Sequence, residues 1–292
     1  MKSRHEARVD HYYDRNTQRF LRCGLRGSSA TIHRAVWAPG VTTRREAVHH
    51  VHELILRHAI DNRRPPIVWD LGCGVGASIA YLAARKRASY RGVTISRTQR
   101  ALAQRLLSRN TALPADDWAV LVGDFCKPET LGRLKASAAG SPSLIYMIEA
   151  FGHATDPRTL LAGAADALCP GGRLVICDDI ISGGQYRAHP QVRTFAAGWR
   201  ISTLWTVDEI SRCAASHGLE LQQSIDLTPW VELNRPRDRL IRLVIDALDR
   251  SGLSGCRFAS LPFWGNMRGG NALQQALATG AIGYRFLVYR KQ

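Results

Sequence analysis

A glycine-rich turn between an apolar strand and a small-residue helix start constrains this chain more than any other feature. Residues 67–78 read Ile-Val-Trp-Asp-Leu-Gly-Cys-Gly-Val-Gly-Ala-Ser, so an aspartate precedes three alternate glycines. Glycine is required where the backbone takes a positive φ or must approach a ligand closely, and such a turn points free N–H groups at a bound molecule. The spacing differs from the G-x-G-x-x-G of dinucleotide-binding folds. The segment predicts a ligand-binding turn, with an ordinary tight strand–helix turn as the alternative.

Predicted strands and helices alternate along most of the chain. We expect strands at 68–71, 90–95, 118–123, 143–148, 173–177, 221–227 and 284–290, and helices at 43–59, 77–85, 97–108, 157–168 and 207–218. This alternation predicts an α/β fold with a doubly wound, mostly parallel sheet. Residues 1–62 are predicted to form an N-terminal helical lid and residues 63–292 the core domain. A mainly helical insertion is expected at about 229–280, before the last strand.

Composition places the chain among ordinary globular proteins. The seven cysteines form no C-x-x-C pair and no zinc spacing, which indicates reduced thiols. No apolar run approaches the ~18 residues that span a bilayer, and the N-terminus lacks the pattern of a secretory signal. A cytoplasmic protein without stable membrane insertion is expected.

The formal net charge of +16 is the unusual global property. Such a charge attracts anions, including nucleic acid, anionic lipid and phosphorylated substrates. Arginine spread evenly over the surface would explain it without any function. The alternative is a site for a small polyanion, since guanidinium groups bind phosphate oxygens bidentately.

The glycine turn resembles the first motif of class I S-adenosylmethionine-dependent methyltransferases. The resemblance implies a Rossmann-like fold with a seven-stranded sheet and S-adenosylmethionine as the cofactor. It also implies that Gly72, Cys73, Gly74 and Gly76 line the methionine part of this cofactor, with Asp70 near its amino group.

Two further strand ends are similar to cofactor-binding positions of the family. The second strand lacks the acid that many class I enzymes use to hold the ribose. Its Gly-Val-Thr-Ile-Ser sequence looks like that of cyclopropane-fatty-acid synthases and of sterol and tocopherol C-methyltransferases, which implies that Thr94 and Gln99 bind the ribose. The alternative is a plain helix N-cap at Ser96. Asp124, at the end of the third strand, is placed to accept the adenine amine, with Phe125 packing on the ring.

The fourth strand favours one substrate class. It lacks the Asn- or Asp-Pro-Pro-Tyr sequence of enzymes that methylate nucleic acid bases, and this argues against a nucleic acid substrate. The sequence from Tyr146 through Glu149 to His153 instead resembles sterol C24-methyltransferases, and the glutamate matches that of geranyl diphosphate C-methyltransferases. Both families methylate an alkene carbon.

A carboxylate suits that chemistry. Attack of a double bond on the sulfonium methyl leaves a carbocation, which a neighbouring carboxylate stabilises and can later deprotonate. Glu149 is therefore the predicted catalytic residue, and an ordinary strand-end carboxylate is the alternative.

Aromatic side chains could line the substrate and stabilise such a cation. The predicted substrate-binding residues are Tyr12, Tyr13, His33, Tyr146, Phe151, Trp199 and Trp205. The first three come from the resemblance, because they match a paired-tyrosine helix and a histidine-aromatic segment of the lid. Simple core packing is the alternative for the aromatic residues.

We expect no dedicated metal site. The histidines at 49, 50, 52 and 58 share a predicted helix, but no carboxylate or cysteine cluster joins them. A solvated or partly packed helix explains them better than a metal centre.

These observations predict methyl transfer to an alkene carbon of an isoprenoid, most readily a prenyl diphosphate. Mg²⁺ is then expected to arrive with the diphosphate, because this cation binds phosphate oxygens with few protein ligands. Arg34 and Arg200 are candidates to hold the phosphates. The partner is thus a small molecule, and a homo-oligomer stays open. The alternatives are a small-molecule O- or N-methyltransferase and a non-enzymatic protein that uses its basic surface.

Overall fold

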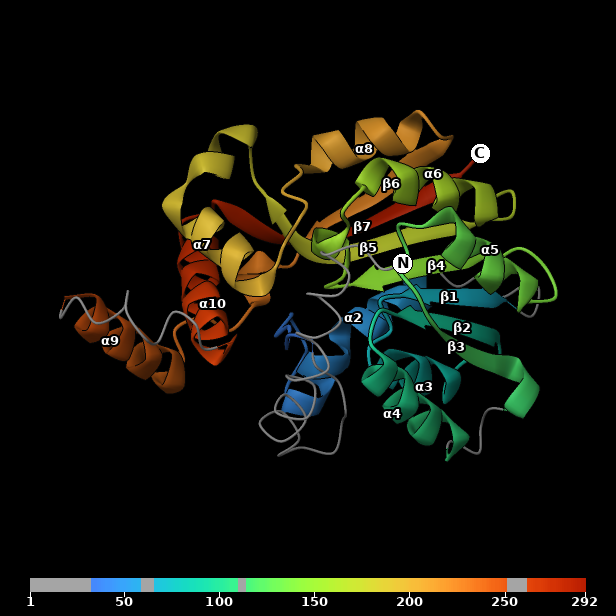
Figure 1. Ribbon diagram of the computed structural model, residues 1–292, viewed down its shortest axis with the longest axis horizontal. Coiled ribbons are helices and arrows are strands. Elements are labelled where there is room, and N and C mark those ends of the chain that lie inside the picture. Colours follow the sequence, from blue (N-terminus) through green and yellow to red (C-terminus); the bar gives the residue numbers. More distant parts are fainter. Residues whose placement is uncertain (1–32, 59–65, 110–113, 251–261) are drawn as a thin grey trace.

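The fold is built on one seven-stranded sheet (Figure 1). The computed structural model describes residues 33–58, 66–109, 114–250 and 262–292. The strands are β1 (Ile67–Leu71), β2 (Ser89–Thr94), β3 (Trp118–Val122), β4 (Leu144–Ile148), β5 (Arg173–Ile181), β6 (Leu219–Asp226) and β7 (Ile282–Lys291). Their order is β3-β2-β1-β4-β5-β7-β6, and β7 runs antiparallel to both neighbours.

This order confirms the predicted doubly wound, mostly parallel Rossmann-like fold. The strand order reverses between β1 and β4, which pair in parallel from Val68 and Leu144 onward. Ligands of open α/β sheets bind at such a reversal, beyond the carboxyl ends of the strands. The glycine turn after β1 and Glu149 after β4 both lie at that position.

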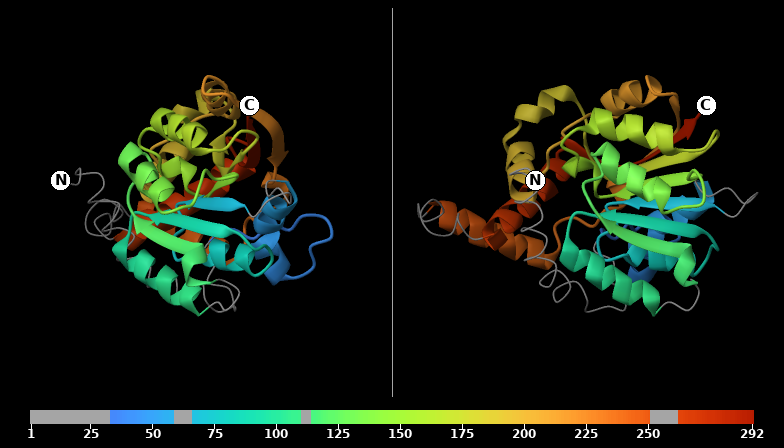
Figure 2. Two further views of the ribbon diagram at one scale, coloured as in Figure 1. Left: turned by 90° about the vertical axis from the view of Figure 1, so that its right-hand side faces the viewer. Right: turned by 45° about the vertical axis from the view of Figure 1, so that its right-hand side comes forward.

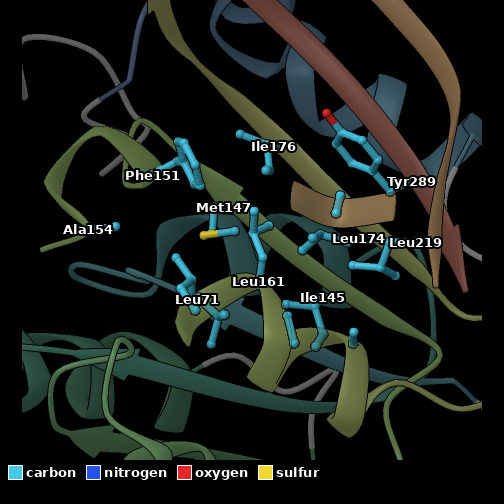
Figure 3. Close-up of a cluster of buried hydrophobic side chains, with 14 of the residues drawn as sticks. Leu71, Ile145, Met147, Phe151, Ala154, Leu161, Leu174, Ile176, Leu219 and Tyr289 are labelled. Carbon is cyan, nitrogen blue, oxygen red and sulfur yellow. The ribbon is translucent and has the colours of Figure 1, made fainter. Parts of the chain in front are cut away.

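Helices cover both faces of the sheet. They are α2 (Arg44–His58), α3 (Ala77–Ala83), α4 (Arg97–Ser108), α5 (Pro128–Ala136), α6 (Pro157–Ala167), α7 (Pro190–Trp199), α8 (Val207–Ala215), α9 (Pro236–Arg250) and α10 (Pro262–Ala278). Helices α2, α3 and α4 pack on one face, and α5, α6 and α8 on the other (Figures 1 and 2). Figure 3 shows the apolar cluster beneath the second group, with Leu71, Met147 and Leu161 at its centre.

Several helix starts follow from local sequence. The Thr43 hydroxyl accepts from the Glu46 amide at 3.2 Å, and the Glu46 carboxylate accepts from the Thr43 amide at 2.9 Å. This reciprocal pair is a capping box at the start of α2. Ser96 caps α4 by accepting from the Gln99 amide at 3.1 Å, as the N-cap alternative predicted.

The structure adds elements that the sequence pattern did not predict. Helices α5 and α7 were missed, and β5 continues four residues beyond its predicted end because it pairs with β7 as far as Ile181. Helices α9 and α10 lie between β6 and β7, within the predicted insertion. Helix α2 belongs to the predicted lid and buries Val51 and Ile55 against the sheet. The division into lid and core stays a prediction. Within the described parts of the chain, no helix has the length and apolar character needed to cross a membrane.

Candidate functional site

The glycine turn has the geometry of a ligand cradle. Gly72, Gly74 and Gly76 take φ values of 100°, 52° and 79°, which side-chain-bearing residues rarely adopt. A Cβ on Gly72 would lie 2.5 Å from the Cβ of Ala150, so the turn packs directly on the segment after β4. A Cβ on Gly74 would meet nothing within 4 Å. At Gly74 the turn therefore presents bare backbone to open space.

Asp70 is the second-to-last residue of β1, just before this turn, and is almost completely buried, with 3% of its surface exposed. Burial raises the pKa of its carboxyl to about 7, against the opposing effect of the Tyr146 hydroxyl, which donates to Asp70 Oδ2 at 2.8 Å. A cationic group next to this carboxyl would favour its ionised form. Tyr146 itself is fully buried in β4, so its hydroxyl contacts Asp70 in the core.

Thr94 and Gln99, the two residues predicted to bind the ribose, are hydrogen-bonded to each other. The hydroxyl of Thr94, the last residue of β2, donates to Oε1 of Gln99 in the first turn of α4 at 2.7 Å, and both residues are buried. Because the amide oxygen is the acceptor in this bond, the Gln99 NH₂ group is the end left to donate. An amide donor can serve a ribose hydroxyl in place of the usual acid.

Asp124 and Phe125 follow β3 at the same edge of the sheet. Asp124 Oδ1 accepts from the Cys126 amide at 2.9 Å, which fixes the carboxylate at the strand end. A ring carbon of Phe125 lies 3.8 Å from the position of a Cβ on Gly72, so this ring borders the glycine turn. A role for these two residues in binding adenine stays a prediction.

A basic groove of about 640 Å³ opens from Asp124 along the edge strand β3. Arg100 Nε donates to the Val120 carbonyl at 3.1 Å, and Arg133 donates to the Val122 carbonyl at 3.3 Å. These arginines satisfy carbonyls on the outer side of β3, which protects an exposed sheet edge from pairing with other chains.

Glu149 stands at the end of β4 with a φ of 51°. For a residue with a side chain this conformation is strained, and such strain is concentrated at functional sites. Its Oε1 accepts from the Arg34 amide at 3.0 Å and from the Tyr284 hydroxyl at 3.1 Å. The side chain keeps 23% of its surface exposed. The carboxylate is therefore held in place and still reachable.

Arg34 links Glu149 to a second carboxylate. Its two terminal nitrogens donate to the two oxygens of Asp179 at 2.7 and 2.5 Å, and its guanidinium lies 4.8 Å from the centre of the Tyr284 ring. Burial opposes the charge on Arg34, but the carboxylates of Asp179 and Glu149 outweigh it and raise its pKa. The fork of Arg34, a candidate to hold phosphate, is thus occupied by Asp179. Arg200 ends α7 with an exposed side chain.

Phe151, Trp199 and Trp205, three more of the predicted substrate aromatics, pack in apolar clusters that do not include Tyr284. Phe151 is buried in the cluster of Figure 3, with the Trp205 ring 6.5 Å away from it. Trp199 packs on α10, where its indole donates to the Asn266 carbonyl at 3.3 Å. Tyr12 and Tyr13 lie outside the described residues. A substrate role for all of these residues stays a prediction.

His33 joins a histidine cluster. Its Nε2 lies 3.2 Å from Nε2 of His52, whose Nδ1 lies 3.1 Å from Nδ1 of His49. Burial lowers the pKa of His33 and of His49 to about 4, so these rings are neutral at physiological pH. Across the described ranges, no three His, Cys, Asp or Glu side chains are grouped so that they could hold a metal.

Sequence reasoning missed Tyr284 and Asp179. They are directly opposed in the β5–β7 ladder, and Tyr284 is fully buried. The sequence carries no local signal for the register of β7 against β5, because β7 is antiparallel and follows a long insertion. Only the alternation of apolar residues in β7 could have indicated that Tyr284 faces inward.

Comparisons with known proteins agree with this geometry. A protein-family profile described as a methyltransferase domain matches residues 69–174. The O-methyltransferase cnsE of Penicillium expansum is 32% identical over 59% of this chain and 58% of that protein. The geranyl diphosphate C-methyltransferase of Streptomyces coelicolor A3(2) superimposes with a TM-score of 0.71 at 15% identity and covers 99% of both chains. Residues 69–174 therefore form a methyltransferase domain, and the chain has the fold of the class I S-adenosylmethionine-dependent methyltransferases.

The family profile matches this chain from β1 to the start of β5, and this range includes the glycine turn and Glu149. The chain spans about half to three fifths of the length of the curated relatives it matches. The solved structure shows a shared fold alone, because a sequence identity of 15% is too low to assign its substrate to this chain.

Proposed function

We propose that this protein transfers the methyl group of S-adenosylmethionine to an alkene carbon of an isoprenoid, with a prenyl diphosphate as the favoured acceptor. The observation that carries the proposal is the Glu149 carboxylate. Glu149 directly precedes Ala150, on which the glycine turn packs, and its carboxylate is held by the Arg34 amide and the Tyr284 hydroxyl while it remains partly exposed.

The cofactor's site is formed by residues that fit its separate parts. Gly72, Gly74 and Gly76 would accommodate the methionine portion in the open space of the turn, with Asp70 facing the ammonium group. Gln99 would hold the ribose, and Asp124 with Phe125 the adenine. When bound, S-adenosylmethionine supplies an electrophilic methyl group on a sulfonium.

Glu149 would act on the acceptor. An alkene needs no base to attack the methyl group, and the attack leaves a tertiary carbocation on the acceptor. A fixed carboxylate stabilises that positive charge without having to reorganise. The same carboxylate can take the proton that is lost when the double bond forms again. Tyr284 and Arg34 keep the carboxylate aimed during both steps.

Mg²⁺ would enter with the substrate. The described residues offer no group of three potential ligands, and hard divalent cations are commonly bound through substrate phosphates. The net charge of +16 favours the approach of such an anion.

O-methylation of a small molecule is the second candidate. It is favoured by the relative cnsE, which is named an O-methyltransferase. In that reaction Glu149 would serve as the general base for a hydroxyl.

The two candidates differ in product. The protein is incubated with isotopically labelled S-adenosylmethionine, with and without Mg²⁺, against prenyl diphosphates, their free alcohols and a panel of phenols, and the products are analysed by mass and NMR. A new carbon–carbon bond supports the proposal. A methyl ether instead establishes O-methylation.

Glu149→Gln tests the catalytic residue. The change keeps the shape and removes the charge, and loss of one preorganised electrostatic group costs ~10²–10³ in kcat. We expect a loss of that size, with cofactor affinity unchanged by calorimetry. Glu129→Gln, on the exposed surface of α5, is the matched control. Retention of more than about half of the wild-type rate by Glu149→Gln would contradict this role.

A further inference from the structure

Helix α9 presents an apolar surface to solvent. Within the described residues, the large hydrophobic side chains that are exposed are Leu240, Leu243 and Val244, at 62%, 66% and 40%. All three lie on α9. Exposed apolar patches on soluble proteins mark sites of interaction.

The apolar surface points away from the protein. At 100° per residue, Leu240, Leu243 and Ala247 lie on the side of the helix opposite Ile245, which is the buried residue of α9. Figures 1 and 2 show α9 at the far end of the molecule, projecting beyond α10 and away from the sheet. A surface helix normally turns its apolar side inward, so this arrangement calls for a partner.

Cationic side chains flank the apolar surface on both sides. Exposed Arg237 lies beside Val244 around the helix, while Arg239 and Arg250 lie beside Leu243. Together with Leu240, these six residues are here called the α9 surface.

Nearby carboxylates cancel these charges only in part. Asp238 is paired with Arg235 at 2.9 Å and lies 3.8 Å from Nε of Arg237, and Asp249 is paired with Arg268 at 3.3 Å. The α9 surface therefore combines leucine and valine with a surplus of arginine.

We propose that the α9 surface binds an anionic lipid membrane. A helix with an apolar side flanked by arginines lies in the headgroup region, where the apolar side chains enter the acyl boundary and the cations meet lipid phosphates. The 15 residues of α9 span about 22 Å, enough to lie along the interface. The absence of a membrane-crossing helix in the described chain is consistent with contact of this peripheral kind.

A second copy of the chain fits the α9 surface less well. Antiparallel pairing of two α9 helices around Leu243 and Val244 would bring Arg237 of each copy toward Arg250 of the other. Each chain also carries a net charge of +16, which opposes close approach. Anionic headgroups complement the same arginines. The proposal does not depend on which acceptor the enzyme methylates.

Vesicle binding tests the proposal. The full chain is sedimented with vesicles of phosphatidylglycerol mixed with phosphatidylcholine, and with vesicles of phosphatidylcholine alone. We expect binding to the anionic vesicles that weakens with salt, and much weaker binding to the neutral ones.

Two double variants separate the contributions of the surface. Leu240→Ser with Leu243→Ser removes apolar contact at exposed positions and should lower the partition coefficient at least ~10-fold. Arg237→Gln with Arg239→Gln should lower it ~10–30-fold, at about 1 kcal/mol per arginine near the membrane.

Arg87→Gln with Arg109→Gln is the matched control, because it removes the same charge from exposed positions outside α9. We expect less than a ~3-fold effect from it. An equal effect of the control would overturn the proposal, as would absence of wild-type binding. Circular dichroism melting establishes that each variant folds. If the leucine variant leaves vesicle binding unchanged but converts a dimer to a monomer in light scattering, the surface instead binds a second copy.

Discussion

Asp70 couples protonation to folding at the scale of a single residue. Its pKa is 3.8 in its ordinary state and about 7 in the folded protein, where burial dominates. Between these pH values the folded state keeps a proton that the unfolded state has lost. The contribution of Asp70 to stability therefore falls as pH rises from about 4 to about 7.

Asp70→Asn should remove this dependence. The amide mimics the protonated carboxyl and still accepts from Tyr146. We expect the variant without cofactor to melt several degrees above the wild type at about pH 8 and close to it at about pH 4, measured by calorimetry. Equal melting temperatures at the higher pH would mean that Asp70 is not destabilised by burial.

Cofactor binding should favour the ionised form of Asp70, whereas burial favours the protonated form. The ammonium group of S-adenosylmethionine would favour ionised Asp70, so affinity should rise ~10-fold as pH increases through about 7, with release of a proton. Titration calorimetry in two buffers of different ionisation enthalpy measures that proton. Burial also raises the pKa of Asp178 to about 7. The Asp70→Asn variant is the control, because it keeps Asp178 and removes only the Asp70 carboxyl. An unchanged pH profile in that variant would assign the effect to another group.

Tyr284 is expected to act through Glu149. Tyr284→Phe removes the hydroxyl that donates to Glu149 Oε1 at 3.1 Å and leaves the Arg34 amide as donor. We expect kcat to fall ~3–10-fold, a cost typical of one lost hydrogen bond. In the Glu149→Gln background the same change should add little, because the partner charge is already gone. Fully multiplicative losses in the double variant would show that Tyr284 acts independently.

At the scale of elements, the sequence predicts what local pattern determines. The alternation of strands and helices was sufficient to predict the parallel sheet and the turn after β1, and Ser96 caps α4 as expected. Long-range pairing was not predictable. Trp199 follows a close α7–α10 contact, in which a Cβ on Gly198 would lie 2.4 Å from the Gly265 carbonyl. No sequence pattern near Trp199 predicts this contact between α7 and α10.

The distinction between local pattern and long-range pairing also explains which residues of the candidate site could be predicted. Residues that follow strand ends, such as Glu149 and Asp124, could be proposed from the sequence because parallel strands share a carboxyl edge. The partners of Glu149 come from residues 115 and 135 positions away, Arg34 and Tyr284. Their meeting depends on the register of β7 and on the path of residues 33–36.

Gly74→Asn tests the turn as an element. Asparagine tolerates the left-handed conformation, and its side chain would enter the open space proposed for the cofactor. We expect S-adenosylmethionine affinity to fall at least ~100-fold with little change in melting temperature. Gly132→Asn, at another glycine whose Cβ would meet nothing within 4 Å, should leave affinity intact. Unchanged affinity in Gly74→Asn would contradict the assignment of the turn.

At the scale of the whole molecule, charge is the dominant property. The +16 charge attracts anions over distances of about a Debye length, ~10 Å at 0.1 M salt. This attraction would act on both the proposed anionic substrate and the proposed anionic membrane, at different parts of the chain. Helix α9 lies at one end of the molecule (Figure 1). Glu149, in contrast, directly follows β4 in the sheet.

The charge of the substrate gives the last prediction. If the acceptor is a prenyl diphosphate, its KM should rise ~3–10-fold between low and physiological salt, because screening weakens the attraction of a multivalent anion. Mg²⁺ should raise turnover of the diphosphate and barely change S-adenosylmethionine affinity, since the metal acts through the phosphates. Steady-state kinetics with the diphosphate and its free alcohol, with Mg²⁺ or EDTA, separate these effects. Equal turnover of the alcohol in EDTA would exclude a role for the diphosphate, and Glu149 would then be assigned to an uncharged acceptor.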